Sequence, residues 1–228
     1  MNHEHQKEKL AGISRRLAQK YSSRLEQLKQ EHSQLNRPDF IWHFLLQSFS
    51  TMGRAAGWRG LIGNKENYSK VTFEALAKLD SYQREEIVRA TCRAAKIRMP
   101  DKKAGFILEG FEHIQKLGGL EKVNELLLRT TAGREGKIEF LMEFPGIGPK
   151  YARNIMMDVY HEDFRDSIAI DIRIKAISDS LGISFNSYAE HENFYLESAK
   201  LAGINGWELD RLLFNFRNEF ENEIKSAS

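Results

Sequence analysis

Apolar residues recur at helical spacing along almost the whole chain, and no segment alternates apolar and polar residues as a strand would. One apolar stripe lies near the C-terminus and comprises Leu209, Leu212, Leu213, Phe216 and Phe220. A second stripe follows Pro149 and comprises Ala152, Ile155, Met156 and Val159. Both stripes are typical of helices that bury one face in a hydrophobic core. The periodicity therefore predicts an all-α protein.

Proline, glycine and capping residues indicate where these helices begin and end. Each of the four prolines, at positions 38, 100, 145 and 149, falls at an expected helix start or in a turn. Asp80 with Gln83 has the spacing of a capping box, and Asn205 with Glu208 provides a second start signal. Residues 53–70, rich in Gly, Arg and Asn, are expected to form a loop with one short turn at most. We expect helices over residues 7–34, 38–46, 72–79, 81–97, 100–117, 120–129, 136–144, 149–160, 171–181, 188–202 and 206–225.

Composition narrows the class of protein. The single cysteine, Cys92, excludes an intrachain disulfide and a four-cysteine iron–sulfur cluster, and it fits an intracellular protein. No apolar run reaches the roughly 18 residues of a transmembrane helix, so we expect no membrane span. The first residues lack the apolar region of a secretory signal. The expected location is the cytoplasm.

The segment from Phe144 to Ala152 carries the most specific local signal. Its turn, Pro145-Gly146-Ile147-Gly148, separates an apolar helix from a second helix that starts at Pro149. The two glycines let the backbone bend sharply, and the start of the second helix presents N–H groups and the positive end of the helix dipole. Such a hairpin is suited to binding a phosphate of DNA. Lys150 lies in the first turn of that second helix.

A lone carboxylate follows the hairpin. Asp171 comes twenty-one positions after Lys150 (171 − 150), directly after the apolar residues Ile168, Ala169 and Ile170. Taken by itself, Asp171 is best interpreted as the N-cap of the helix that follows it. The same helix end would keep the carboxylate ionised, so a cap and a chemical role are compatible.

Hairpin, lysine and aspartate in this order resemble the helix-hairpin-helix DNA glycosylase superfamily. A third match is the segment 101–107, Asp-Lys-Lys-Ala-Gly-Phe-Ile, which is similar to a helix start in the endonuclease III branch. The chain departs from that branch because one cysteine cannot hold its iron–sulfur cluster. The resemblance implies two helical lobes with a DNA-binding cleft. Residues 38–160 would form the central lobe that ends in the hairpin, and residues 1–37 with 161–228 would form the second lobe.

The resemblance implies a reaction as well. Cleavage of an N-glycosidic bond builds positive charge at C1′ of the sugar, which a nearby carboxylate such as Asp171 stabilises. A neutral amine at Lys150 can attack C1′ and form a Schiff base, which permits β-elimination of the 3′ phosphate. In the superfamily a lysine at this position marks the glycosylases that are also AP lyases. The alternative for Lys150 is a simple contact with a DNA phosphate.

Further residues are expected to contact the DNA. The damaged base must leave the helix stack, and Gln47 or Phe49, in the turn after the residue 40–46 helix, is a candidate to fill the gap. A core position is nearly as probable for Phe49, and core packing is the preferred role for Trp42, Trp58 and Trp207. Beside the hairpin, a group of basic residues is interpreted as a footprint for the DNA backbone, and it comprises Arg89, Arg93, Lys96, Arg98, Lys102 and Lys103.

The sequence thus predicts a monomeric DNA repair enzyme whose partner is double-stranded DNA with a damaged base or an abasic site. We expect no cofactor and no catalytic metal, since the histidines lack ligand spacing. The resemblance allows a monovalent ion at the hairpin carbonyls. Two alternatives stay open: a monofunctional glycosylase in which Lys150 is not the nucleophile, and a non-catalytic hairpin module that only binds DNA. The excised base, whether an oxidised purine, an oxidised pyrimidine or an alkylated purine, is not identified by the sequence.

Overall fold

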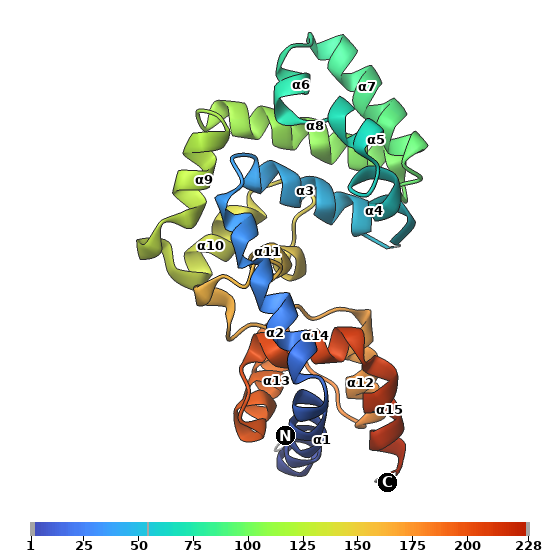
Figure 1. Ribbon diagram of the computed structural model, residues 1–228, viewed down its shortest axis with the longest axis vertical. Coiled ribbons are helices and arrows are strands. Elements are labelled where there is room, and N and C mark those ends of the chain that lie inside the picture. Colours follow the sequence, from blue (N-terminus) through green and yellow to red (C-terminus); the bar gives the residue numbers. More distant parts are fainter. Residues whose placement is uncertain (1–2, 54, 227–228) are drawn as a thin grey trace. The chain divides into compact units, whose positions relative to one another are not determined.

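A computed structural model describes residues 3–53 and 55–226 of the chain. Throughout these residues the regular structure is helical and no strand occurs, so the predicted all-α class is confirmed. The chain divides into two compact units (Figure 1). One unit is continuous, from Gln34 to Ile155. The other unit combines the chain up to Ser33 with the chain from Met156 onward.

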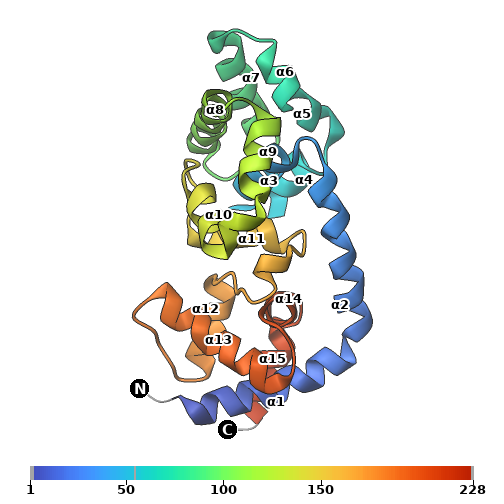
Figure 2. The same cartoon turned by 90° about the vertical axis from the view of Figure 1, so that its left-hand side faces the viewer.

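The continuous unit contains the helices that lead to the hairpin. They are α3 (Phe40–Thr51), α4 (Ala55–Leu61), α5 (Lys65–Lys70), α6 (Phe73–Ala77), α7 (Ser81–Ala94), α8 (Pro100–Lys116), α9 (Leu120–Leu128), η2 (Thr130–Ala132) and α10 (Gly133–Met142). The capping box at Asp80 forms as predicted, with Gln83 N–H donating to the Asp80 carboxylate at 2.8 Å. Helices α7 and α8 pack side by side, and α3 packs on α4, α8 and α9 (Figure 2). The core of this unit is aromatic, with the Trp42 ring 5.5 Å from Phe73 and 6.1 Å from Phe111.

The discontinuous unit is built from both ends of the chain. Its helices are α1 (Glu4–Lys20), α2 (Ser22–Lys29), η3 (Glu162–Phe164), α12 (Ile172–Ser180), α13 (Tyr188–Ala202), α14 (Gly206–Asn215) and α15 (Arg217–Ser226). Helix α1 packs along α13 and also contacts α14 and α15 (Figure 2). Two elements span the boundaries of the units, η1 (Gln30–Asn36) and α11 (Pro149–Met157). The start signal at Asn205 is confirmed, because Asn205 and Glu208 form a complete capping box.

Two helices that the periodicity predicted as continuous are broken. The predicted helix 7–34 is interrupted at Tyr21, and the predicted helix 206–225 is interrupted at Phe216. The two interruptions meet, since the Tyr21 and Phe216 rings stack at a centroid distance of 3.6 Å with an interplanar angle of 8°. Neither position carries a Gly or Pro that would have indicated a break. The aromatic contact, which is a tertiary interaction, accompanies both of them.

The prediction of a loop over residues 53–70 is wrong, because this segment contains the helices α4 and α5. Its glycines serve close packing. A Cβ on Gly57 would lie 2.3 Å from the Ser50 carbonyl oxygen, and one on Gly60 would lie 2.1 Å from the Ala95 carbonyl oxygen. Since no real Cβ approaches an oxygen so closely, only glycine lets α4 pack at this distance. Glycine content alone had suggested a loop.

Candidate active site

The hairpin turn lies between α10 and α11, and its apolar side chains hold it to the core. Phe144 and Ile147 are buried, at 1% and 5% exposure, and the Ile147 N–H donates to the Phe144 carbonyl at 3.0 Å. The Ala152 N–H donates to the Gly148 carbonyl at 3.0 Å, which closes the first turn of α11. Pro145 and Gly148 are half-buried and Gly146 is exposed. The turn therefore keeps its side chains inside and part of its backbone accessible.

The two glycines of the turn differ in what requires them. Gly146 has φ +82°, and a Cβ there would lie 2.4 Å from the Phe106 ring. Gly148 has no protein atom within 4 Å of the place where a Cβ would be. The backbone conformation and the contact with Phe106 are therefore sufficient to require glycine at position 146. At Gly148 the space that a side chain would fill is open.

Lys150 extends from the first turn of α11. Its side chain is half-buried, and its Nζ lies 4.1 Å from the centroid of the adjacent Tyr151 ring. Ammonium groups are attracted to the faces of aromatic rings at this distance. On the same helix, Arg153 is buried and donates to the Pro149 carbonyl at 3.1 Å. Lysine and arginine thus add positive charge to a helix end that is already positive by its dipole.

The start of α8 supports the turn from the same unit. The Phe106 ring, which lies against Gly146, has the Lys102 Nζ at 5.7 Å and the Lys103 Nζ at 5.3 Å. Lys102 is exposed and can reach a phosphate, whereas Lys103 is 8% exposed and its amine contacts the Met52 sulfur. Burial, together with the nearby charges of Lys102 and Arg98, lowers the pKa of the Lys103 amine below its ordinary value. Lys103 is therefore a buried lysine beneath the turn.

Phe49 and Gln47, the two candidates to fill the gap left by a flipped base, differ in their exposure to solvent. Phe49 is only 1% exposed, and its ring lies 5.8 Å from Phe106. Phe49 therefore belongs to the core, where its ring is not accessible to DNA. Gln47, half-buried on the preceding turn of α3, keeps part of its side chain accessible.

The tryptophans follow the same division. Trp42 and Trp207 are buried, and their indole N–H groups donate to the Val71 and Met157 carbonyls at 2.8 and 2.6 Å. Trp58 is 40% exposed. Core packing is thus the role of Trp42 and Trp207.

The basic group of α7 and α8 is smaller at the surface than the sequence suggested. Asp101 lies 2.7 Å from the Arg93 guanidinium and 3.6 Å from that of Arg89, and Glu85 lies 2.8 Å from Arg89. These carboxylates offset part of the positive charge. Arg98 and Lys102 are exposed. Arg98 lies over Gly53, whereas Lys102 lies by Phe106, the ring that packs against Gly146 of the hairpin.

Asp171 caps α12, as the residues alone indicated. One carboxylate oxygen accepts hydrogen bonds from the Arg173 N–H at 2.8 Å and the Ile174 N–H at 3.1 Å. The side chain is half-buried, and the second oxygen is not used by this cap. The structure thus holds Asp171 in a fixed orientation.

An exposed apolar surface adjoins Asp171, and the sequence analysis missed it. Ile172 is 82% exposed and Phe214 is 52% exposed, with the Arg173 guanidinium 4.3 Å from the Phe214 ring centroid. Phe214 sits one position off the buried stripe of α14, which is the signal that could have revealed it. An exposed aromatic ring with a cation beside it is suited to contact with a planar group.

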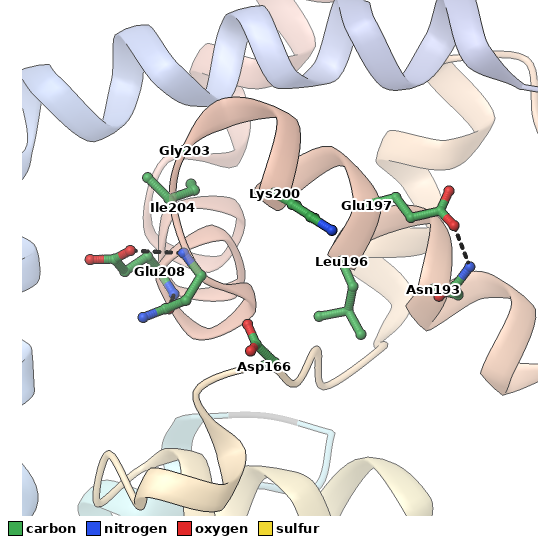
Figure 3. Close-up of a pocket in the computed structure, with 9 residues that line it drawn as sticks. Asp166, Asn193, Leu196, Glu197, Lys200, Gly203, Ile204 and Glu208 are labelled. Carbon is green, nitrogen blue, oxygen red and sulfur yellow. Dashed lines mark hydrogen bonds between the residues drawn. The ribbon is translucent and has the colours of Figure 1, made fainter.

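A pocket of about 650 Å³ lies elsewhere in the discontinuous unit, around the turn between α13 and α14 (Figure 3). Its lining includes the carboxylates of Asp166, Glu197 and Glu208. Glu197 pairs with Lys7, and Glu208 lies 2.9 Å from Lys29. With Lys200 also in its lining, the pocket carries charges of both signs and lacks the clustered basic side chains that would indicate a nucleic-acid site.

Over residues 3–53 and 55–226, no three His, Cys, Asp or Glu side chains come together as ligands of a metal ion. None of the helices in these ranges has the length and hydropathy needed to cross a bilayer.

Among solved structures, the chain is similar to the crystal structure of the 8-oxoguanine DNA glycosylase of Thermotoga maritima. The TM-score is 0.67, the alignment covers 91% of this chain and 95% of that one, and 19% of the residues are identical. This likeness establishes the fold, and the fold that the resemblance implied is confirmed. No protein family and no curated protein matches the sequence of the chain.

Proposed function

We propose that this protein is a DNA glycosylase with AP lyase activity that excises a damaged base from double-stranded DNA. The observation that carries the proposal is a phosphate-suited hairpin with Lys150 on its second helix, followed by Asp171 as a helix cap, in the fold of a DNA glycosylase. A module that only binds DNA would need the hairpin but neither the lysine nor the aspartate.

In the proposed reaction the Lys150 amine, in its neutral form, attacks C1′ of the damaged nucleotide. The C1′–N bond breaks, and the base leaves with its electron pair and takes up a proton. The amine then loses a proton, the C1′–O4′ bond breaks and O4′ takes up a proton, which gives a protonated imine between Lys150 and the opened sugar. Removal of a C2′ proton expels the 3′ phosphate by β-elimination, and water hydrolyses the imine to release the enzyme.

Asp171 supplies charge rather than a bond in this scheme. Positive charge develops at C1′ as the base departs, and a fixed carboxylate stabilises it without reorganising. The cap supports this role, because two N–H donors hold one oxygen and leave the other to face the sugar.

The hairpin positions the DNA. Backbone N–H groups at the start of α11 and the exposed Lys102 would bind phosphates, which orient a duplex without reading its sequence. The open space at Gly148 is where a phosphate oxygen can approach the backbone. Gln47 is the candidate to fill the gap that the flipped base leaves.

8-Oxoguanine is the lesion that we propose as substrate, because the solved structure to which the chain is similar is a glycosylase for that base. Excision should be measured on a panel of duplexes, each with one oxidised purine, oxidised pyrimidine or alkylated purine. Preference for another lesion would correct the substrate and leave the activity class in place. Inactivity on the whole panel, with normal DNA binding, would favour the non-catalytic module.

Borohydride trapping tests the lyase step. Borohydride reduces an imine to a stable amine, so the wild-type protein should become covalently linked to lesion-containing DNA. Lys150→Gln should abolish both the crosslink and strand nicking at abasic sites. Lys150→Arg should fail as well, because a guanidinium stays protonated.

Lys103 provides the matched control for this test. It lies in the same unit, it is buried, and its pKa is lowered, so it is the lysine that could replace Lys150 as nucleophile. Lys103→Gln should retain the crosslink. Loss of the crosslink in Lys103→Gln but not in Lys150→Gln would transfer the role to Lys103. Base release without any crosslink in the wild type would identify a monofunctional glycosylase.

A further inference from the structure

The three residues before Asp171 form a short buried segment outside any helix. The side chains of Ile168, Ala169 and Ile170 are 0%, 4% and 6% exposed. The Ile170 N–H points back to the Ile168 carbonyl at 3.1 Å, so the backbone makes a tight turn just before Asp171. Buried N–H groups need acceptors, and this segment has no neighbouring strand to supply them.

Three side chains supply acceptors, one for each successive N–H. Glu192 accepts from the Ile168 N–H at 3.0 Å, and Asp210 accepts from the Ala169 N–H at 2.8 Å. The Tyr188 hydroxyl accepts from the Ile170 N–H at 3.0 Å and donates to the Ile168 carbonyl at 2.9 Å. We call Tyr188, Glu192 and Asp210 the clamp.

The chemistry of the clamp is unusual for a purely structural contact. Glu192 and Asp210 are each only 4% exposed, and burial disfavours a carboxylate unless hydrogen bonds compensate for lost water. Hydrogen bonds from N–H groups to carboxylates are shorter and stronger than those to neutral acceptors. The clamp residues come from two different helices, α13 and α14, which are rigid elements. The clamp therefore fixes the path of the backbone from two sides.

That path determines where the Asp171 carboxylate lies. The cap bonds to Arg173 and Ile174 hold the side chain against the start of α12, so its position follows the backbone on both sides of it. The clamp holds the preceding side, and Ile170, whose N–H bonds to Tyr188, is the residue directly before Asp171.

We propose that Tyr188, Glu192 and Asp210 are positioning residues that set the Asp171 carboxylate at the distance from C1′ that base excision requires. The inference rests on the proposed function, in which Asp171 stabilises the charge at C1′. None of the three touches the DNA in this proposal. They act through the backbone of residues 168–170, so their loss lowers the rate of the chemical step and leaves DNA affinity intact.

The test is single-turnover base excision with enzyme in saturating excess, alongside the Kd for DNA with an uncleavable lesion analogue. Tyr188→Phe removes both hydroxyl contacts and keeps the ring. Because a misplacement of about 1 Å can lower a rate roughly 100-fold, we expect a loss of about 10- to 100-fold. The Kd should stay within about threefold of wild type, because phosphate contacts at the hairpin supply most of the affinity.

Two substitutions of Asp210 test the role of its carboxylate. Asp210→Ala removes the acceptor and should slow excision like Tyr188→Phe, whereas Asp210→Asn keeps an acceptor oxygen and should restore most of the rate. If Asp210→Ala does not fold, Tyr188→Phe decides the question, because it deletes a single oxygen.

Ser198→Ala is the matched control, since it also deletes a single hydroxyl oxygen from α13. The Ser198 hydroxyl is buried and donates to the Phe194 carbonyl at 2.9 Å, within its own helix. That carbonyl belongs neither to residues 168–170 nor to the cap of α12. Ser198→Ala should therefore leave the excision rate unchanged.

Asp171→Asn separates failure of this inference from failure of the proposed function. If Asp171→Asn excises at the wild-type rate, the role of Asp171 itself is wrong. If Asp171→Asn is inactive while Tyr188→Phe keeps the wild-type rate, the clamp does not position the carboxylate. Equal rate losses in Tyr188→Phe and Ser198→Ala would also overturn the inference, because they would reflect general loosening of the unit.

Discussion

Replacing Gly146 by alanine should destabilise the protein, whereas the same change at Gly148 should not. At Gly146 the backbone has φ +82°, and placing an L residue in this left-handed region costs about 1–2 kcal/mol. The new Cβ would also lie 2.4 Å from the Phe106 ring, so the ring must move. Overpacking of this kind adds about 1–3 kcal/mol. We expect a total loss of about 2–5 kcal/mol.

For Gly148→Ala, two small contributions to the free energy of unfolding oppose each other. A Cβ meets no protein atom within 4 Å, and alanine reduces the conformational entropy of the unfolded chain, which stabilises by about 0.4–1 kcal/mol. Alanine is, however, a poorer residue than glycine at the start of a helix, by a comparable amount. The free energy of unfolding should therefore change by less than about 0.5 kcal/mol. DNA affinity should fall, since the methyl group fills the space through which a phosphate would approach.

Thermal unfolding and DNA binding, measured on both variants, check this reasoning. For a chain of this size the loss at Gly146 corresponds to a melting temperature lower by about 4–20 °C. Gly148→Ala should melt within about 2 °C of wild type and bind undamaged and damaged duplexes more weakly, by a similar factor. A Gly146→Ala protein as stable as wild type would refute the packing argument. A Gly148→Ala protein with wild-type affinity would show that no phosphate approaches there.

Three further predictions follow from particular contacts. Asp171→Asn should change the free energy of unfolding by less than about 0.5 kcal/mol, because asparagine caps helices as well as aspartate does. The rate of base excision should nevertheless fall by at least about 100-fold, and a variant that loses stability but keeps its excision rate would show that Asp171 is only a helix cap. Burial lowers the pKa of His191 from 6.5 to about 4, so the unfolded chain gains a proton that the folded chain does not as the pH falls below 6.5, and about 2 kcal/mol of stability should be lost at pH 5. Urea unfolding at pH 7 and pH 5 measures this loss, which should shrink in His191→Gln; an unchanged pH dependence in that variant contradicts the assignment. Gly60→Ala should destabilise by about 1–3 kcal/mol in urea unfolding, since its Cβ would lie 2.1 Å from the Ala95 carbonyl oxygen, and a stable variant would show that α4 can shift.

Local chemistry in the sequence was sufficient to predict most of the helices and the hairpin. Helical periodicity, proline positions and the capping residues at Asp80 and Asn205 act over one or two turns, so neighbouring residues are enough to reveal them. The same locality explains Asp171. Its role as a helix cap depends only on the N–H groups two and three positions ahead.

Contacts between distant parts of the chain decided the rest, because burial and close approach depend on what the chain meets after folding. The breaks at Tyr21 and Phe216 accompany the stacking of two rings from opposite ends of the chain. Phe49 belongs to the core because Phe106 packs against it. The N–H groups of residues 168–170 are satisfied by side chains at positions 188, 192 and 210, and no spacing in the sequence relates those positions to Asp171. The sequence by itself therefore determined most of the helices and which residues could carry chemistry. Only the tertiary structure decided how the backbone before Asp171 is held, because the side chains that accept from the N–H groups of residues 168–170 lie about 20 to 40 positions away in the sequence.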